Sequence, residues 1–234
     1  MKKCLLCNQM FAPVLSLNQL LSWRKWHEEQ LCHHCLAQFE FLPTISCKIC
    51  SGKLLQDADK QSLICSDCRR WQKIYGNNVL YHQAVYLYNQ AFHDLMVNYK
   101  RYGDYVLCYV LQDLCYKNLA KIKADYYVPI PTSASHIAER QFDTVSAIYG
   151  DLVNLTAILG KIDGQQAQGE KNRKERLQSK QSFFIKAKYN IDLNMKKVLL
   201  LDDIYTTGRT LYHARDAVLT TFPKAKISSF SVCR

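Results

Sequence analysis

Four Cys-x-x-Cys pairs within the first 68 residues constrain what this chain can fold into more than any other feature of its sequence. With 11 cysteines in 234 residues, chance alone would produce about half of one such pair. A Cys-x-x-Cys knuckle places two sulfur atoms on one side of a tight turn, and two facing knuckles supply the four thiolates of a tetrahedral zinc site. Two structural zinc ions are therefore predicted, held by Cys4/Cys7, Cys32/Cys35, Cys47/Cys50 and Cys65/Cys68.

The order of the knuckles indicates how the two metals would share them. Sequential pairing gives one site made of Cys4, Cys7, Cys32 and Cys35 and another made of Cys47, Cys50, Cys65 and Cys68, and an interleaved pairing is the alternative. Four sulfur ligands leave no open position for water, so both sites are expected to be structural. A thioredoxin-like redox role would need a βαβ context, which residues 1–73 lack.

The composition excludes disordered and fibrous chains, because 48% of the residues are apolar and only 8 are glycine and 5 proline. The longest apolar runs fall far below the ~20 residues of a membrane-spanning helix, and nothing after the basic start Met1-Lys2-Lys3 is typical of a secretion signal. We therefore expect a cytoplasmic protein without membrane insertion. In that compartment closely spaced thiols bind metal more often than they form disulfides, while the single cysteines Cys108, Cys115 and Cys233 are expected to be small buried apolar residues.

The formal net charge of +11 counts every cysteine as a neutral thiol. Eight thiolates and two Zn²⁺ ions would bring residues 1–73 to a net charge of about zero. The basic surface that could attract nucleic acid or phosphate groups is then expected beyond residue 73.

The sequence pattern changes near residue 73, which predicts two domains, residues 1–73 and 74–234. The first consists of cysteine knuckles and loops. The second alternates strands with helices, as in an α/β fold with a parallel sheet flanked by helices. Strands are expected at residues 83–88, 126–131, 196–201 and 226–232, and helices at residues 91–99, 105–122, 136–159 and 208–222.

The most informative stretch begins with the apolar strand that ends at Leu201, because two carboxylates and a threonine-rich turn follow it. Open parallel sheets bind ligands at the carboxyl ends of their strands. Backbone N–H groups of residues 206–209 and the hydroxyls of Thr206, Thr207 and Thr210 would converge on the positive end of the next helix, forming an anion cradle. Gly208 would let the backbone approach a phosphate with no Cβ atom in the way.

The two carboxylates, Asp202 and Asp203, narrow the choice of ligand, since they would repel a simple phosphate. A molecule with a phosphate at one end and vicinal hydroxyls nearby suits both parts of the site, because the cradle would bind the phosphate and the carboxylates would accept hydrogen bonds from the hydroxyls. Ribose 5-phosphate is such a molecule. With a pyrophosphate on the anomeric carbon, Mg²⁺ would bridge pyrophosphate and ribose oxygens. A Walker-type ATPase is excluded, because the closest phosphate-loop candidate, residues 164–171, has Glu170 where lysine should follow glycine.

Residues 198–210 resemble the phosphoribosyl pyrophosphate signature of type I phosphoribosyltransferases. Together with the knuckles, they make the chain similar to the ComF family of competence-associated proteins, over nearly its full length. Further matches are the segment Lys100 to Asp104 and the segment Val128 to Pro131 followed by Arg140-Gln141-Phe142-Asp143. Gln141 and Asp143 stand where the family commonly has Gly and Asn.

The resemblance implies a double zinc-ribbon domain followed by a type I phosphoribosyltransferase-like domain that binds phosphoribosyl pyrophosphate with Mg²⁺. Pro131 to Ser135 would form the pyrophosphate loop, and residues 173–176 would belong to a mobile loop over the site. The implied ligand-binding residues are Asp202, Asp203, Thr206, Thr207, Gly208, Arg209, Thr210, Pro131, Thr132, Ser133, Lys171 and Arg173.

The same resemblance implies a function in competence: cytosolic handling of incoming single-stranded DNA during natural transformation, alongside a ComFA-like DNA-translocating ATPase on which the zinc module docks. The alternative is an active phosphoribosyltransferase that transfers ribose 5-phosphate to an unidentified acceptor, for which the sequence offers no recognisable acceptor site or base. The side chains expected to contact nucleic acid are Lys100, Arg101, Arg140, Lys174, Arg176 and Lys180. Phe183, Phe184 and Tyr189 could stack on bases.

Overall fold

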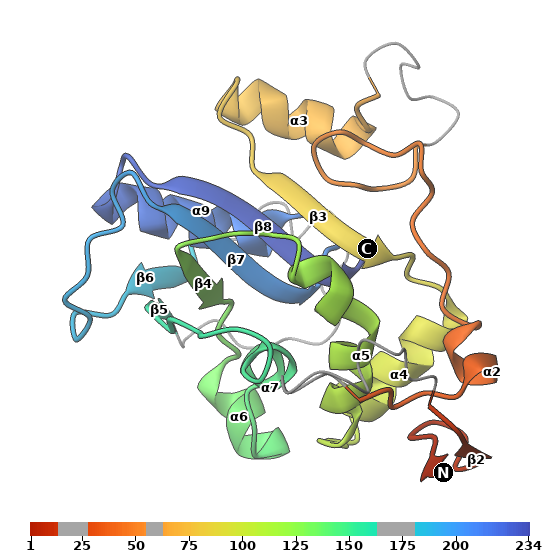
Figure 1. The fold of residues 1–234 in the computed structure, drawn as a ribbon. Coiled ribbons are helices and arrows are strands. Elements are labelled where there is room, and N and C mark those ends of the chain that lie inside the picture. The colour runs from red at the N-terminus through yellow and green to blue at the C-terminus, as the bar shows by residue number, and fades with distance from the viewer. Residues whose placement is uncertain (14–27, 55–62, 163–180) are drawn as a thin grey trace.

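The computed structural model describes residues 1–13, 28–54, 63–162 and 181–234 (Figure 1). Its centre is a four-stranded sheet in which neighbouring strands run parallel, in the order β3-β8-β7-β4. The strands are β3 (Tyr81–Tyr86), β4 (Tyr126–Pro129), β7 (Lys197–Ile204) and β8 (Lys226–Cys233). This arrangement confirms the predicted α/β fold, a parallel sheet flanked by helices and preceded by a cysteine-rich segment.

Both faces of the sheet are covered, as a parallel sheet requires. Successive residues of a strand point to opposite faces, so in β7 Leu199 and Leu201 join one buried cluster while Val198 and Leu200 join the other. The first cluster includes residues of α4 (Gln90–Lys100), α5 (Leu107–Leu119) and α7 (Thr144–Tyr149). The second includes residues of α9 (Arg209–Thr221) and of the hairpin formed by β5 (Leu159–Lys161) and β6 (Phe183–Ile185).

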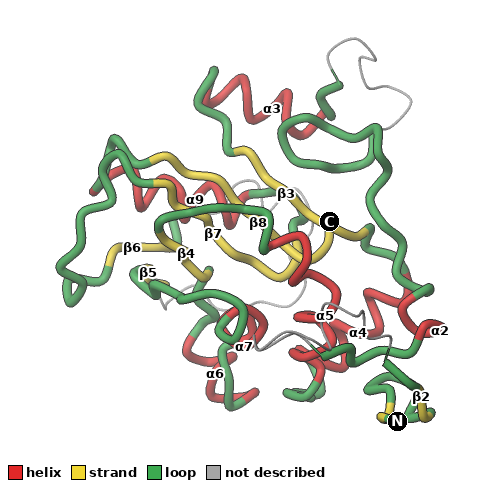
Figure 2. The backbone as a smooth tube through the Cα atoms, in the orientation of Figure 1, coloured by secondary structure: helices red, strands yellow, loops and turns green. Residues whose placement is uncertain are grey.

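The cysteine-rich segment contributes to both clusters. It contains β1 (Lys2–Lys3), β2 (Met10–Phe11), α2 (His33–Leu36) and α3 (Ser66–Tyr75), and Figure 2 shows that the described chain between α2 and α3 is mostly loop. Its first cysteines pack in the cluster with α4 and α5, and its last four pack in the cluster with α9. The domain boundary near residue 73 stays a prediction, and α3 runs through it.

Backbone segments pair with both edges of the sheet. Along β3, the Leu42 N–H donates to the Val85 carbonyl at 2.9 Å. Along β4, the Thr156 N–H donates to the Tyr127 carbonyl at 2.8 Å, and Tyr127 forms a parallel bridge with Leu155. Each outer strand therefore has hydrogen-bond partners on its outward side.

The single helix predicted over residues 136–159 is wrong. The structure has α6 (Ala134–Arg140), then α7, and β5 begins at Leu159. Gln141 ends α6 in the left-handed region, with φ 68°. The Asp143 carboxylate then accepts a hydrogen bond from the Ser146 N–H at 2.8 Å, which caps the start of α7.

Two other features differ from the expectation. The strand predicted to end at Leu201 continues to Ile204, so Asp202 and Asp203 lie within β7 and not after it. Helix α3 and the β5–β6 hairpin were not expected at all. Each is short and packs against distant parts of the chain, which local periodicity does not reveal.

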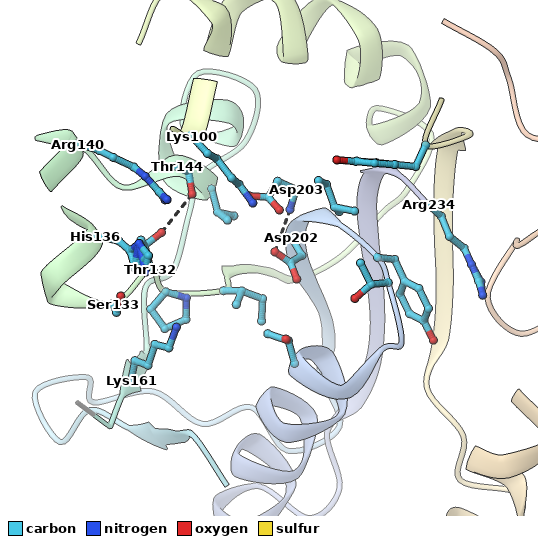
Figure 3. A pocket seen from close by; sticks show the side chains of 18 of the residues that line it. Lys100, Thr132, Ser133, His136, Arg140, Thr144, Lys161, Asp202, Asp203 and Arg234 are labelled. Atoms are coloured by element: carbon cyan, nitrogen blue, oxygen red, sulfur yellow. Dashed lines mark hydrogen bonds and ion pairs between the residues drawn. The ribbon is translucent and has the colours of Figure 1, made fainter. Parts of the chain in front are cut away.

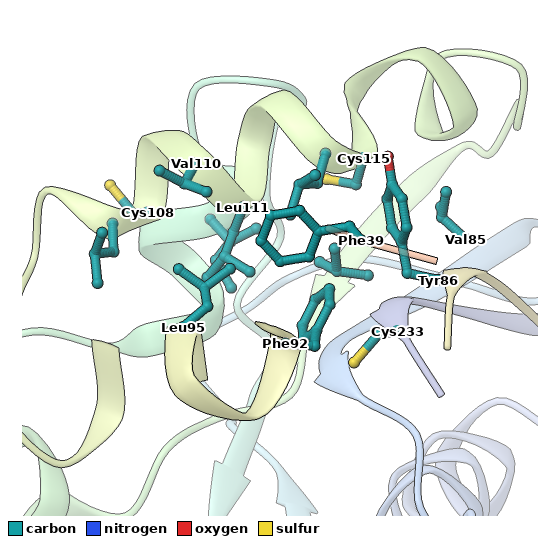
Figure 4. Packing of buried hydrophobic residues seen from close by; sticks show 14 of the residues in the cluster. Phe39, Val85, Tyr86, Phe92, Leu95, Cys108, Val110, Leu111, Cys115 and Cys233 are labelled. Atoms are coloured by element: carbon teal, nitrogen blue, oxygen red, sulfur yellow. The ribbon is translucent and has the colours of Figure 1, made fainter. Parts of the chain in front are cut away.

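The isolated cysteines Cys108, Cys115 and Cys233 are fully buried in the cluster that Figure 4 shows. They pack among side chains such as Phe92 and Leu111, as predicted for small apolar residues. None of the helices in the described ranges has the length and hydropathy needed to span a bilayer.

Candidate metal centres and ligand cavity

The eight knuckle cysteines form two separate tetrads. The first tetrad comprises Cys4, Cys7, Cys32 and Cys35, and the second tetrad comprises Cys47, Cys50, Cys65 and Cys68; within each, the Sγ atoms lie within 4.8 Å of one another. A tetrahedron with Zn–S bonds of about 2.3 Å has S···S edges of about 3.8 Å. The Cys7–Cys32 and Cys50–Cys65 Sγ pairs are 3.7 and 3.5 Å apart. The sequential pairing is therefore confirmed, and both tetrads fit a structural zinc ion.

The leading knuckle of each tetrad has the same local geometry. Asn8 and Ser51, directly after the second cysteine of the knuckle, adopt positive φ angles of 60° and 57°. Their N–H groups donate to the carbonyls of Cys4 and Cys47, each at 2.9 Å. This turn brings the two sulfur atoms of a knuckle to one side, as a metal site needs.

A cavity of about 950 Å³ opens at the carboxyl ends of β4 and β7 (Figure 3). Both acids at the end of β7 line it, together with the loop after β4 and the first turn of α9. Five cationic side chains and three carboxylates reach its wall: Lys53, Lys100, Arg140, Lys161, Arg234, Asp67, Asp202 and Asp203. The surplus of positive charge suits an anion, while the paired acids suit hydroxyls or a divalent cation.

Asp203 is paired with the last residue of α4. It is only 5% exposed, and one of its carboxylate oxygens lies 2.6 Å from the Lys100 Nζ atom. In Figure 3, Lys100, Arg140 and Lys161 lie on one side of the acids and Arg234 on the other. The ion pair neutralises a carboxylate that would otherwise be buried without a partner charge.

Asp202 is the second carboxylate at the end of β7. Burial and the adjacent Asp203 carboxylate raise its pKa from 3.8 to about 7, while Lys100 acts in the opposite direction. Its carboxylate accepts a hydrogen bond from the Asp203 N–H at 2.9 Å, and its carbonyl accepts one from the Tyr149 hydroxyl at 2.8 Å. Near neutral pH the Asp202 carboxyl can therefore change its protonation state as a ligand or cation binds.

The threonine turn divides between two hollows. Thr206 and Thr210 line the large cavity, whereas Thr207 and Arg209 line a separate hollow of about 170 Å³ beside α3. Gly208 is the N-cap of α9 with φ 80°, and a Cβ atom there would collide with the hydroxyl of Tyr205. Glycine is thus required for the turn itself, in addition to any role in phosphate approach.

The loop after β4 forms the opposite wall. Pro131, Thr132 and Ser133 line the cavity, and their role as a pyrophosphate loop stays a prediction. The Thr132 N–H donates to Asp143 Oδ2 at 3.0 Å, and the same carboxylate caps α7. Asp143 therefore fixes the loop to α7, and the Thr132 amide is already engaged.

The other predicted site residues are distributed as follows. Lys171, Arg173, Lys174, Arg176 and Lys180 lie outside the described residues. Lys100 and Arg140, predicted to contact nucleic acid, line the same cavity as the acids. Arg101, the C-cap of α4, is exposed.

Sequence reasoning missed several cavity residues: Lys53, Asp67, His136, Lys161 and Arg234. They come from segments far apart in the chain, and only Asp67 belongs to a motif, the Cys65-x-x-Cys68 knuckle, so the fold alone brings them together. Burial lowers the pKa of His136, and the nearby Arg140 cation acts in the same direction. His136 is therefore expected to be neutral at pH 7.

The chain is similar to known proteins over nearly its whole length. "Competence protein ComFC" of Streptococcus pneumoniae (strain ATCC BAA-255 / R6) is 34% identical over 239 residues, which cover 99% of this chain and all of the relative. "Competence protein ComFC" of Bacillus subtilis (strain 168) is 25% identical over 244 residues, covering 99% and 94%. The family model described as Trm112p-like protein matches residues 38–71, which contain the second tetrad.

Elemental analysis of protein purified under reducing conditions is expected to find two zinc ions per chain. Cys4→Ser and Cys68→Ser should each lower this number to about one, because three remaining thiolates bind zinc far more weakly than four. Cys115→Ser, which changes a buried thiol outside both tetrads, is the matched control and should retain two. Wild-type protein without zinc would contradict the assignment.

The raised pKa of Asp202 predicts a specific pH dependence of stability. The folded chain holds this proton up to about pH 7, whereas the unfolded chain releases it near pH 4, so the folded state binds more protons between these values. The free energy of unfolding should therefore fall as the pH rises from about 4 to 7. Asp202→Asn removes this contribution, and urea titrations should show the wild type losing about 1–3 kcal/mol more than the variant across the window. Parallel curves for the two proteins would show that Asp202 titrates normally.

Proposed function

The chain belongs to the ComFC family of competence proteins, and from this we propose that it acts in natural transformation, with a cavity that binds phosphoribosyl pyrophosphate and Mg²⁺. In this proposal it handles incoming single-stranded DNA together with a ComFA-like ATPase. The two zinc sites give the cysteine-rich segment the rigidity that a docking surface for this ATPase needs.

The observation that carries the ligand proposal is the composition of the cavity at the carboxyl ends of β4 and β7. Paired acids, the first turn of α9 and the loop after β4 converge there, with five cations around them. A phosphate would lie against Thr206 and Thr210, where the positive end of α9 favours negative charge. The ribose hydroxyls would then donate hydrogen bonds to Asp202 and Asp203.

The pyrophosphate would lie on the other side of the cavity, between the loop after β4 and the cations Arg140 and Lys161. Asp202 and Asp203 would hold Mg²⁺, which would supply positive charge against the pyrophosphate. Asp202, whose pKa is about 7, can lose its proton as this charge arrives. Lys100, paired with Asp203, would be able to turn toward the ligand anion.

The proposal for single-stranded DNA rests on the surface after α4. Arg101 is exposed there, and Tyr102, Tyr105 and Tyr109 have exposed rings beside it. Exposed aromatic rings next to a cation form the kind of surface on which unpaired bases stack. This surface adjoins the cavity through Lys100, so DNA would approach the ligand site closely.

Isothermal titration calorimetry with phosphoribosyl pyrophosphate and Mg²⁺ tests the ligand. Wild type should bind, and the double variant Asp202→Asn/Asp203→Asn should bind at least about tenfold more weakly, because neutral amides neither attract Mg²⁺ nor accept as strongly from ribose hydroxyls. Asp192→Asn is the control, since it removes an exposed charge in the loop before β7, at the end of that strand opposite to the cavity. Equal affinities for wild type and double variant would show that the acids do not contact the sugar.

Salt titrations of oligo-dT binding test the DNA surface. True phosphate contacts predict a log–log slope near −0.7 for each phosphate neutralised. Arg101→Gln should therefore make the slope shallower by about 0.7, and Tyr102→Ala should lower the affinity at an unchanged slope. Lys121→Gln, which removes an exposed cation in the loop before β4, at the end of that strand opposite to the cavity, should change neither. Absence of binding at low salt would remove this part of the proposal.

A further inference from the structure

The second tetrad is physically connected to the anion cradle by α3. This helix begins at the metal site, because Cys65 is its N-cap and Cys68 lies in its first turn. Trp71 follows one turn later and is only 2% exposed. Its Nε1–H donates to the carbonyl of Thr207 at 2.9 Å, in the middle of the threonine turn.

Aromatic stacking holds the remainder of α3 along α9. The Trp71 and Tyr212 rings stack with centroids 4.1 Å apart, and the Tyr75 and Tyr212 rings stack at 4.8 Å. The Tyr75 hydroxyl donates to the Asp216 carboxylate at 2.6 Å. The helix whose first turn forms the cradle is thus fixed against the helix that starts at the second tetrad.

A second connection runs through Arg234. Its guanidinium lies 2.6 Å from Cys50 Sγ and donates to the Cys50 carbonyl at 3.2 Å. The same group lies 4.7 Å from the centroid of the Tyr205 ring, which packs against Gly208. A Cβ atom at Gly52 would collide with this guanidinium, so the knuckle is shaped to admit it.

The first tetrad has a different environment. Cys4, Cys32 and Cys35 belong to the buried cluster on the face of the sheet covered by α4 and α5. The second tetrad belongs to the cluster that contains Tyr205, Leu211 and Tyr212, the residues around the cradle. The first tetrad can therefore serve as an internal control for the effect of the second tetrad on the cradle.

We propose that the second tetrad anchors the anion cradle, and that its metal content sets the affinity of residues 206–210 for phosphate. Trp71 and Arg234 are the positioning residues that transmit this control. The statement about affinity rests on the proposed function, whereas the coupling between metal and loop stands on the contacts alone. By linkage, a ligand in the cradle must stabilise the metal to the same extent that the metal strengthens ligand binding.

The physical basis is the cost of starting a short helix. A helix as short as α3 is marginal in isolation, because its first turn fixes several residues for one hydrogen bond. A metal that binds Cys65 and Cys68 holds that first turn in place. Loss of the metal would release α3 and with it the Trp71 contact to Thr207.

Hydrogen exchange measured by mass spectrometry tests the coupling without any ligand. Cys68→Ser should speed exchange in peptides covering residues 203–213 by about tenfold. Cys4→Ser, which changes an equally buried ligand of the first tetrad, should leave these peptides unchanged. Equal effects of the two variants on these peptides, or none in a folded Cys68→Ser, would overturn the proposal.

Two variants that leave all eight metal ligands in place test the same coupling if Cys68→Ser does not fold. Trp71→Phe keeps an aromatic ring at this position but removes the donor to Thr207, and Arg234→Gln removes the charge beside Cys50. Both should keep two zinc ions and still speed exchange over residues 203–213. Unchanged exchange in both would overturn the proposal.

Zinc release to a chelator gives the reciprocal measurement. Phosphoribosyl pyrophosphate with Mg²⁺ should slow release from the second tetrad of wild type, and Trp71→Phe should reduce this protection, an effect that a purely structural residue would not have. If wild type does not bind phosphoribosyl pyrophosphate, the proposed ligand is wrong, and the exchange data still decide the coupling. If it binds but does not protect the metal, the coupling is wrong.

Discussion

Four-sulfur coordination is the constraint on which the rest of this molecule depends. The described chain between α2 and α3 is mostly loop, and fixing such a segment costs conformational entropy that regular secondary structure does not offset. A structural zinc ion contributes about 10–16 kcal/mol of apparent binding free energy in small zinc domains. Metal binding at the two tetrads would fix the segment on both faces of the sheet, because one tetrad lies in each buried cluster.

The ligand cavity brings opposite charges close together, with more cationic side chains than carboxylates in its wall. Asp203 is paired with Lys100, whereas burial and the Asp203 carboxylate raise the pKa of Asp202 to about 7. Further cations surround the acids. Such a site suits a ligand that has anionic groups at its ends and hydroxyls or a bridging cation between them, since each part then meets a partner already in place.

The regular parts of this structure could be predicted from the sequence, because their signals are local. The apolar run Val198 to Leu201, the two acids after it and Gly208 specify a strand, a turn and a helix within about twenty residues. The spacing of the cysteines likewise revealed two metal sites. The break between α6 and α7 was missed because Asp143 acts through hydrogen bonds to Thr132 and Ser146 that periodicity does not report. The same holds for Trp71 and Arg234, whose partners in the turn and the knuckle are 136 and 184 residues away.

The covered edges of the sheet limit how other molecules can be recognised. Many proteins capture an extended segment by letting it add to an open sheet edge, where unpaired N–H and C=O groups wait for a partner. Here the segments around Leu42 and Leu155 already occupy those positions beside β3 and β4. At β3 and β4, a protein or nucleic acid that associates with this chain would therefore be recognised through side chains and loops, and specificity there would reside in surface residues that can diverge between relatives while the sheet stays the same.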